Sequence, residues 1–411
     1  MAQIADRAAR SLRIGIDYTS AVRQRAGIGR YTRNLLRALA GLDSENQYIL
    51  FVAGGGGGDS GGYDLAAWPE NFRIRSVPIS DRWLNILWQR FRLPLPVQWV
   101  TGRLDLFHSP DFVLPPVGCI PAILTVHDLS FLRVPHCFLP EFRQYLEAAV
   151  ARAVRRARWI LADSENTRQD LIELLAVEPE RVSVLYPGVE PRFRPVEDAL
   201  ELDRVRIRYG LPQRFILGVG TLQPRKNFDG LIRAFAQLLA MRGCDLELDS
   251  VCLVIVGEKG WMYEEVLALP ERLGIEERVH FVGFVDDADL PALYTLAEVL
   301  AFPSWYEGFG LPVLEAMGCG TPVVAADNSS LPEVVGEAGI LVDAGNSEAW
   351  AEALAGLMSD EGLRTRLATA GRGQTRRFTW EGSARQLLTI YQAIGADRTV
   401  ADSRLRIVKR I

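Results

Sequence analysis

Short apolar runs alternate with stretches of helical periodicity along most of the chain. The first run, RIGIDYTS at 13–20, indicates a strand, and the apolar positions Tyr31, Leu35 and Leu39 then recur at the spacing of an amphipathic helix. The same order returns in the second half, where FILGVGTL at 215–222 precedes another helical stretch. This alternation predicts an α/β architecture, in which helices cover both faces of a parallel sheet.

A proline-containing segment divides this pattern into two halves. With 411 residues, the chain is too long for one ordinary core. The segment 187–203 carries three prolines and lacks clear periodicity, which is typical of a linker. We therefore expect two doubly wound, Rossmann-like domains that face a cleft: an N-terminal domain at 1–190, a linker at 191–204 and a C-terminal domain at 205–378.

Composition and charge exclude several classes of protein. Hydrophobic residues make up 48% of the chain and charged residues 24%, as in soluble globular proteins. The net charge of −5 gives no reason to expect a nucleic-acid partner. The histidines lack zinc-site spacing, the cysteines form no CxxC pair, and no apolar run approaches the roughly 20 residues of a membrane span. We expect a cytoplasmic protein without a metal site, and any membrane contact is expected to be peripheral.

One amphipathic stretch, SDRWLNILWQRFRLPLP at 80–96, admits two interpretations. Its apolar side chains share one helical face and arginines lie nearby; these are Leu84, Leu87, Trp88 and Phe91, with Arg82, Arg90 and Arg92. Such a helix usually packs against its own domain. The alternative is a surface that meets a lipid-linked acceptor or the inner face of the membrane.

The loop after the first strand contains two glycines, Gly27 and Gly29. Glycine allows the backbone to approach a ligand closely, and the alternative is a tight turn without a ligand. The dinucleotide pattern GxGxxG is not completed, because Arg30, Tyr31 and Thr32 follow. This argues against a standard NAD site.

A histidine lies near the end of the predicted strand AILTVHDL at 122–129. His127 and Asp128 are at its carboxyl end, which is where open α/β sheets bind ligands. His127 is therefore a candidate site residue. The alternative is a histidine whose hydrogen bonds are satisfied inside the fold.

The stretch FPSWYEGFGLPVLE at 302–315 has the features of a phosphate-and-sugar site. An apolar strand leads into it, a glycine turn follows at 308–310, and a helix begins at Leu311. A helix N-terminus after a glycine turn is suited to anions. Glu307 and Glu315, on either side of the turn, are suited to hydroxyl groups, because an ionised carboxylate only accepts hydrogen bonds.

Two cations and an aromatic residue follow other predicted strands at the same edge. Arg225 and Lys226, in GTLQPRKN, suit a diphosphate, because arginine binds phosphate bidentately and lysine is a mobile point charge. The alternative for this pair is solvated surface. Phe284 and Val285, in GFVDDADL, are candidates to flank a nucleobase, and the alternative is core packing of Phe284.

As a set, these motifs resemble the retaining GT-B glycosyltransferases of family 4. EGFGLPVLE is similar to the E-x7-E motif of that family, and the resemblance extends to GTLQPRKN, GFVDDADLPALYTLA, GTPVVAAD, GIGRY, TVHD and DSENT. The nearest resemblance is to bacterial mannosyltransferases of the O-antigen and exopolysaccharide type. FTWEGSARQLLTIYQAI at 378–394 resembles the closing helix of the family, expected at about 380–397, which crosses back to the first domain.

The resemblance implies a role for each candidate residue. Glu307 would contact hydroxyls of the donor sugar, and His127 would lie beside the donor sugar and the acceptor. Arg225 and Lys226 would bind the diphosphate and stabilise the leaving group. The other implied contacts are Phe309, Gly310 and Leu311 with the sugar and phosphate, Glu315 with the ribose, and Gly27 and Gly29 with the phosphate or acceptor. Many relatives carry an arginine where this chain has Thr221, which leaves more of the phosphate charge to the two cations.

The implied activity is metal-independent transfer of a hexose, with retention of configuration and without a cofactor. The donor would be a nucleotide-diphosphate sugar, with GDP-mannose the first choice and a UDP-sugar, for glucosyl or N-acetylglucosaminyl transfer, the second. The acceptor would be a glycan or a lipid-linked molecule. The alternatives are a nucleotide-sugar epimerase, a sugar phosphorylase and a non-catalytic binding subunit with the same fold.

Overall fold

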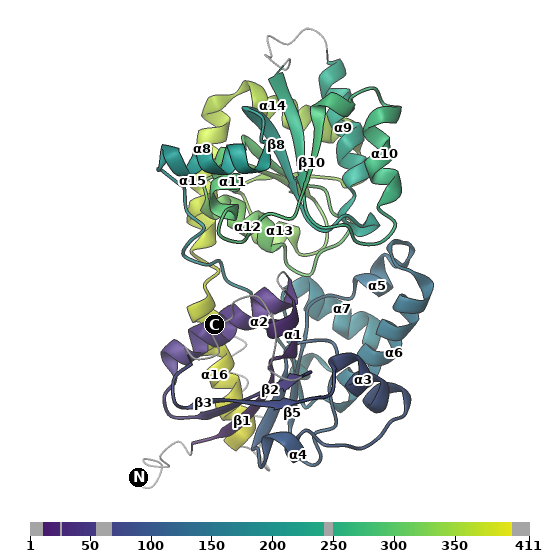
Figure 1. Cartoon of the computed structure of the whole chain (residues 1–411), viewed down its shortest axis with the longest axis vertical. Helices are drawn as coiled ribbons and strands as arrows, with labels where there is room; N and C mark the ends of the chain where they lie inside the picture. Colours follow the sequence, from purple (N-terminus) through teal and green to yellow (C-terminus); the bar gives the residue numbers. More distant parts are fainter. Residues whose placement is uncertain (1–10, 25–26, 55–67, 242–249, 397–411) are drawn as a thin grey trace. The chain divides into compact units, whose positions relative to one another are not determined.

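The computed structural model describes residues 11–24, 27–54, 68–241 and 250–396, which belong to two compact units (Figure 1). The first unit comprises Met1–Leu129, Gln144–Gly188 and Trp380–Ile411. The second unit comprises Ser130–Arg143 and Val189–Thr379. Each unit is built on its own parallel sheet, which confirms the two doubly wound α/β halves expected from the alternation of strands and helices.

The first unit contains a seven-stranded parallel sheet with the order β3-β2-β1-β4-β5-β6-β7. Its strands are β1 (Arg13–Asp17), β2 (Gln47–Ala53), β3 (Phe72–Val77), β4 (Leu106–Ser109), β5 (Ala122–Val126), β6 (Trp159–Ala162) and β7 (Val182–Val184). In the register, Ile16 of β1 lies between Leu50 of β2 and His108 of β4. Strands β4, β5 and β6 are buried along their whole length, as expected for a parallel sheet covered on both faces.

The helices of this part of the chain include those expected after the first strand, near 80 and at the closing segment near 380. They are α1 (Thr19–Arg23), α2 (Ile28–Leu42), α3 (Asp81–Asn85), the π-helix η2 (Ile86–Arg90), α4 (Gln98–Thr101), α6 (Pro140–Arg156), α7 (Glu165–Leu175), the 3₁₀ turn η4 (Pro179–Arg181) and α16 (Trp380–Ala396). Ser164 caps α7, because its hydroxyl accepts a hydrogen bond from the Thr167 N–H at 3.0 Å.

Two predicted strands of the first unit are shorter than expected. The strand predicted at 13–20 ends at Asp17, and α1 begins at Thr19. The Asp17 carboxylate accepts a hydrogen bond from the Thr19 N–H at 3.0 Å. Side chain-to-backbone bonds of this kind favour a turn over continued pairing in a sheet. The apolar run RVSVLYPGV at 181–189 also indicates a strand, and only Val182–Val184 form one, β7.

The amphipathic helix predicted at 80–96 also differs from the observed one. It ends at Arg90, before two prolines that cannot continue a helix. Its second half is a π-helix, whose wider turn changes which side chains share a face. Leu84 is buried, as expected for a helix that packs against its own domain, whereas Phe91 is 62% exposed, as expected for the alternative of a surface that meets a ligand or membrane.

The second unit contains a six-stranded parallel sheet with the order β10-β9-β8-β11-β12-β13. Its strands are β8 (Arg214–Val219), β9 (Val251–Val256), β10 (Val279–Gly283), β11 (Val299–Phe302), β12 (Val323–Ala326) and β13 (Ile340–Val342). Every residue of β9 is buried, which identifies it as an interior strand.

Two layers of helices cover this sheet. The helices and helical turns of the second unit are α5 (Ser130–Arg133), η3 (Pro135–Cys137), α8 (Ala199–Tyr209), η5 (Pro224–Lys226), α9 (Phe228–Ala240), α10 (Glu264–Arg272), η7 (Glu276–Arg278), α11 (Leu290–Leu296), α12 (Leu311–Gly318), α13 (Leu331–Val335), α14 (Ser347–Ser359) and α15 (Glu361–Thr375). Helix α9 packs with α10 and α14, whereas α11 and α12 pack with α8 and α15 (Figure 1).

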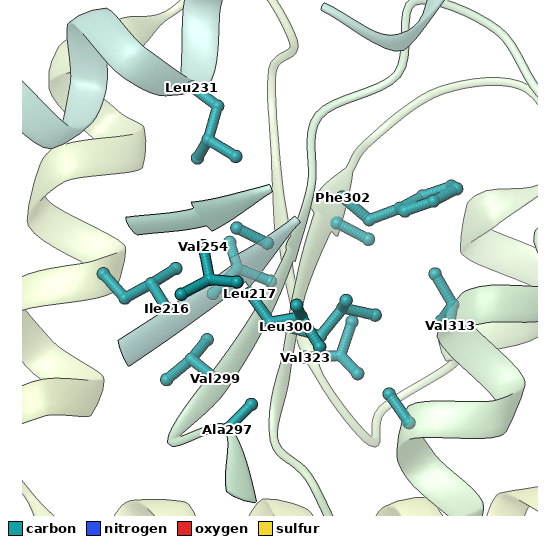
Figure 2. Packing of buried hydrophobic residues seen from close by; sticks show 14 of the residues in the cluster. Ile216, Leu217, Leu231, Val254, Ala297, Val299, Leu300, Phe302, Val313 and Val323 are labelled. Atoms are coloured by element: carbon teal, nitrogen blue, oxygen red, sulfur yellow. The ribbon is translucent and has the colours of Figure 1, made fainter. Parts of the chain in front are cut away.

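The apolar core of the second unit joins neighbouring strands to these helices. Figure 2 shows Leu217 of β8 and Leu300 of β11 close together in this core. Leu231 of α9 and Val313 of α12 belong to the same buried cluster. The ends of β8 and β11 are therefore fixed by packing on both sides of the sheet.

Helix α8 begins at Ala199, inside the segment 191–204 that the sequence predicts as a linker. The Asp198 carboxylate caps it by accepting a hydrogen bond from the Leu200 N–H at 3.0 Å. Part of this segment is therefore regular structure of the second unit, and the predicted domain boundaries stay predictions.

The C-terminal helix α16 packs against α2 and β4, which confirms the predicted return of the chain to the first unit. The Tyr391 hydroxyl lies 2.6 Å from Nδ1 of His108 in β4, and Nε2 of His108 lies 2.9 Å from the Thr125 hydroxyl in β5. Burial lowers the pKa of His108 to about 3, so the ring is neutral. One buried network thus joins the last helix to two strands.

Candidate active site

The second sheet reverses its strand order between β8 and β11, which is where doubly wound folds bind ligands. The chain leaves β8 into η5 and leaves β11 into residues 303–310. The two strands are parallel neighbours, with Leu300 paired to Leu217. The loops that carry the predicted cations and the predicted carboxylate therefore meet at one edge of the sheet.

Three charged side chains from these loops form the Glu307 cluster, which consists of Glu307, Arg225 and Lys226. Lys226 Nζ lies 2.6 Å from Oε1 of Glu307, and Arg225 Nη1 lies 2.9 Å from Oε2. Only 14% of the Arg225 side chain and 11% of the Lys226 side chain are exposed. The interpretation of this pair as solvated surface is therefore wrong.

The charge of the Glu307 cluster follows from its pairing. Burial alone would raise the pKa of Glu307, but Arg225 and Lys226 outweigh burial and lower it to about 2. The carboxylate is therefore ionised at neutral pH, and two cations with one carboxylate give a net charge of +1. In the described ranges, no group of three acidic, histidine or cysteine side chains is arranged to hold a metal ion. The cluster can attract an anion but cannot supply a proton from Glu307.

Main-chain contacts hold the two loops in register. The Trp305 N–H donates to the Arg225 carbonyl at 2.9 Å, and the Arg225 guanidinium donates to the Tyr306 carbonyl at 2.6 Å. Asn227 has a φ of +54°, and its side-chain amide donates to the Pro303 carbonyl at 3.0 Å. The two cations are thus positioned by the backbone as well as by the carboxylate.

The turn between Glu307 and α12 requires glycine at one position. Gly310 has a φ of +105°, and a Cβ there would lie 2.8 Å from Cδ2 of Leu331. The Ser330 hydroxyl lies 3.0 Å from the Glu307 carbonyl and 2.9 Å from that of Phe309. Because the Phe309 side chain is buried, any contact of this turn with a ligand falls to its backbone.

The other residues predicted to contact the nucleotide sugar differ in how deeply they are buried. Glu315 is buried on α12, and its Oε2 accepts a hydrogen bond from the Tyr294 hydroxyl at 3.0 Å. Val285 is buried in the core, whereas Phe284 is 37% exposed directly after β10. Thr221 is exposed after β8. The roles of these residues toward a ligand stay predictions.

In the first unit, the two glycines of the predicted loop differ in backbone conformation and in the space around them. Gly27 precedes α2 with a φ of +58°. A Cβ on Gly29 would lie 2.1 Å from the Gln24 carbonyl oxygen and 2.8 Å from that of Ser20. Tight packing between α1 and the start of α2 therefore requires glycine at position 29, and the approach of either glycine to a ligand stays a prediction.

His127 follows β5 and is engaged on both ring nitrogens. Nδ1 lies 2.7 Å from Oδ2 of Asp163, and Nε2 lies 3.1 Å from the Pro110 carbonyl oxygen. Because both partners are acceptors, only the imidazolium form can donate to both. Burial alone would lower the pKa of His127, but Asp163 outweighs burial and raises it to about 9. This geometry fits the interpretation of a satisfied histidine, and a role toward the donor stays a prediction.

The sequence analysis did not identify Asp163 as a site residue. Asp163 follows β6 directly, and β6 pairs with β5. Parallel neighbours end at the same edge of a sheet, so an acidic residue after one strand and a histidine after the next are expected to meet. This adjacency of strands was the missing information.

We predict that the His127–Asp163 pair makes folding less favourable as the pH rises. The pKa of His127 is about 9 in the fold against an ordinary value of 6.5, so its contribution to stability is complete below pH 6.5 and is lost as the pH rises to about 9. Urea unfolding at pH 6 and pH 9 should show a lower free energy of unfolding at pH 9. Asp163→Asn should reduce this difference, and the control His280→Asn should preserve it. An unchanged difference in Asp163→Asn would contradict the assignment.

Comparison with known proteins agrees with this geometry. Residues 203–374 match the family described as Glycosyl transferases group 1, and residues 25–193 match Glycosyltransferase Family 4. The chain is 33% identical over 379 residues to O-antigen chain mannosyltransferase B of Escherichia coli, covering 90% of this chain and 96% of that protein. It is 35% identical over 322 residues to D-inositol 3-phosphate glycosyltransferase of Salinispora tropica, covering 72% of this chain and 66% of that protein.

A solved structure has the same fold. HepE from Anabaena, in complex with UDP and glucose, superposes with a TM-score of 0.70 at 20% sequence identity, covering 93% of this chain and all of that chain. One assignment follows from the two parallel sheets, from the C-terminal helix that returns to the first unit, and from the family matches. The chain belongs to the group 1 glycosyltransferases of family 4 and has the GT-B fold.

Proposed function

We propose that this glycosyltransferase moves a hexose, with mannose favoured, from a nucleotide-diphosphate sugar to a glycan or lipid-linked acceptor in cell-surface polysaccharide synthesis. The Glu307 cluster carries the proposal, because a carboxylate suited to sugar hydroxyls lies beside two cations suited to a diphosphate. The likeness to an O-antigen mannosyltransferase supports mannose, and with it GDP-mannose as donor. The reaction would be cytoplasmic, metal-independent and retaining.

The chemistry of the leaving group fits the cluster. Breaking the bond between the sugar and the diphosphate leaves an oxocarbenium-like centre and adds negative charge to the departing nucleotide. Arg225 and Lys226 are largely shielded from solvent and already held by Glu307, so they would stabilise that charge with little reorganisation. Ionised Glu307 would orient a donor hydroxyl, and it would take no part in proton transfer.

Other residues would complete the site in the roles expected from the family. The base would lie against Phe284 and Val285, the ribose against Glu315, and the phosphate beside Thr221. The sugar and phosphate would meet the backbone of Phe309, Gly310 and Leu311. In the first unit, His127, Gly27 and Gly29 would face the donor sugar or the acceptor.

A UDP-sugar-dependent glucosyl or N-acetylglucosaminyl transferase is the second candidate. HepE has this fold and was solved with UDP and glucose. The Salinispora relative is named for a different acceptor, inositol 3-phosphate, so the acceptor varies among relatives of similar identity. An epimerase or a non-catalytic subunit is less favoured, because the cluster joins groups for both the sugar and its leaving group.

We predict that Lys226→Ala and Glu307→Ala each lower transfer from the preferred donor by at least about 100-fold, as expected when a group that stabilises transition-state charge is removed or misplaced. The matched control is Arg214→Ala. Arg214 pairs with Glu298 at 2.6 Å and joins the amino ends of the same two strands, β8 and β11. Thermal unfolding of each variant should establish that the fold is retained.

The assay should compare GDP-mannose with UDP-glucose and UDP-N-acetylglucosamine. Faster transfer from GDP-mannose would support the first candidate, and faster transfer from a UDP-sugar would support the second. Full activity of both Lys226→Ala and Glu307→Ala would contradict the role of the Glu307 cluster. Loss of activity in the Arg214→Ala control to the same extent would assign the effect to the fold instead.

We also propose a peripheral contact between the first unit and a membrane. None of the helices in the described ranges has the length and apolar content to cross a bilayer. On α3 and just after η2, however, Trp83 is 61% exposed and Phe91 62% exposed. Arg82, Arg90 and Arg92 are exposed beside them. Aromatic rings favour the bilayer interface and arginine is attracted to anionic lipid, so a lipid-linked acceptor could be met there.

We predict that Trp83→Ala combined with Phe91→Ala lowers binding to vesicles of phosphatidylglycerol and phosphatidylcholine about tenfold, through loss of buried apolar area. Co-sedimentation measures the bound fraction. The control is Leu200→Ala combined with Ile207→Ala, which removes two side chains that are each 81% exposed on α8 of the second unit. Equal binding by both double variants would contradict the proposed surface.

A further inference from the structure

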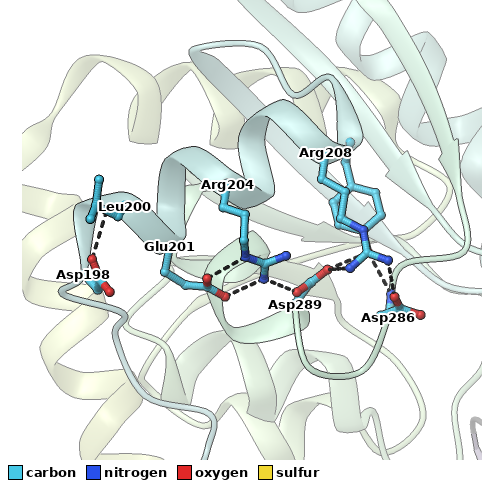
Figure 3. Close-up of polar contacts among 8 residues, drawn as sticks. Asp198, Leu200, Glu201, Arg204, Arg208, Asp286 and Asp289 are labelled. Atoms are coloured by element: carbon cyan, nitrogen blue, oxygen red, sulfur yellow. Dashed lines mark hydrogen bonds and ion pairs between the residues drawn. The ribbon is translucent and has the colours of Figure 1, made fainter.

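The loop after β10, residues 284–289, is held by side chains from α8. We name Arg204, Arg208 and Tyr209 the α8 clamp. Figure 3 shows Arg204 and Arg208 directed from α8 toward Asp289, and Arg208 also meeting Asp286. The loop and the helix are far apart in sequence, so these contacts fix a surface loop to an element that precedes the sheet.

Asp289 is the loop residue that all three side chains of the α8 clamp contact. It is 2% exposed, and its carboxylate lies 2.5 Å from Arg204 Nη2, 2.7 Å from Arg208 Nη1 and 2.7 Å from the Tyr209 hydroxyl. Burial alone would raise the pKa of Asp289, but the hydrogen bonds from Arg204 and Tyr209 outweigh burial and lower it. Asp289 precedes α11 without capping it, although aspartate at such a position commonly does. Its carboxylate serves the contact with α8 instead.

The clamp holds both ends of the loop. Arg208 bridges Asp289 at the end of the loop and Asp286 near its start. The Tyr209 hydroxyl donates to Asp289 and accepts a hydrogen bond from the Asp286 N–H at 3.1 Å. Arg192 adds a hydrogen bond of 2.6 Å to the Asp287 carbonyl. A loop tied at Asp286, Asp287 and Asp289 has little freedom to change its path.

The first residue of this loop is Phe284, the half-exposed ring proposed to meet the base of the donor. It follows Gly283, which has a φ of +79°. The Gly283 carbonyl accepts a hydrogen bond from the Gly257 N–H at 2.8 Å, so the start of the loop is tied to the end of β9. The α8 clamp fixes the remainder of the loop. Together these contacts determine where the Phe284 ring is presented.

We propose that the α8 clamp consists of positioning residues for the base of the donor nucleotide. The clamp would act through the loop on Phe284, and it would set the affinity for the nucleoside part of the donor. The diphosphate would be bound separately by the Glu307 cluster. This inference rests on the proposed function, and it predicts that the two parts of the donor respond differently to changes in α8.

Calorimetric titration of the full chain with GDP, UDP and inorganic pyrophosphate tests this separation. Arg208→Ala should weaken binding of the preferred nucleotide about tenfold, the typical effect of losing a charge-assisted contact, and leave pyrophosphate binding unchanged. Arg208→Lys should restore part of the affinity, because lysine keeps the charge but cannot bridge both carboxylates. In the transfer assay, KM for the donor should rise while kcat changes little. Arg214→Ala, at the amino end of β8 and away from the proposed ligand edge, should change none of these values.

The possible results separate this inference from the proposed function. Equal weakening of nucleotide and pyrophosphate by Arg208→Ala, or no weakening of either, overturns the inference alone. Failure of the unmodified protein to bind GDP, UDP and pyrophosphate overturns the proposed function and this inference with it. Should Arg208→Ala fail to fold, Tyr209→Phe removes the hydroxyl shared by Asp286 and Asp289 but keeps the ring. That variant removes one hydrogen bond to a carboxylate and one from a backbone N–H, so it should weaken nucleotide binding about tenfold, and unchanged nucleotide binding overturns the inference.

Discussion

The ion pairing of Glu307 with Arg225 and Lys226 is the constraint on which the second unit depends at its ligand edge. A buried carboxylate is tolerated only when it is paired, and two cations from one loop pair this one. The pairing joins the carboxyl ends of β8 and β11, where the strand order reverses. The same three charges therefore serve two purposes: they fix two loops against each other, and they leave a positive net charge at the edge where a phosphate group is proposed to bind.

The alternation of apolar and amphipathic stretches was sufficient to predict two parallel sheets and the edge at which Arg225, Lys226 and Glu307 lie. It could not predict that these residues touch, because contact depends on which strands are neighbours. The same limitation concealed Asp163, whose strand pairs with that of His127. The extent of the helix at 80–96 was not predicted either, because nothing in the apolar spacing indicates that its second half is a π-helix ending at Arg90. The clamp residue Arg204 lies in the segment expected as a linker, and neither Arg204 nor Arg208 could be linked to the loop after β10, because that contact depends on how α8 packs.

Both units place a charged pair at the carboxyl ends of adjacent strands. In the first unit the pair is His127 with Asp163, and its positive partner is an imidazolium whose charge depends on pH. In the second unit the cations keep their charge across the physiological range. Around this core, elements remote in sequence support the site, since α16 completes the first unit and α8 holds the loop proposed to meet the base.

The most direct test of the central claim is the affinity of the Glu307 cluster for a bare diphosphate. Inorganic pyrophosphate should be titrated into the unmodified protein, Lys226→Ala and the control Arg214→Ala. We expect the unmodified protein and Arg214→Ala to bind pyrophosphate, and Lys226→Ala to bind it at least about tenfold more weakly, because a charge-assisted contact is lost. Equal affinity in all three proteins would contradict the claim that this cluster is the diphosphate site.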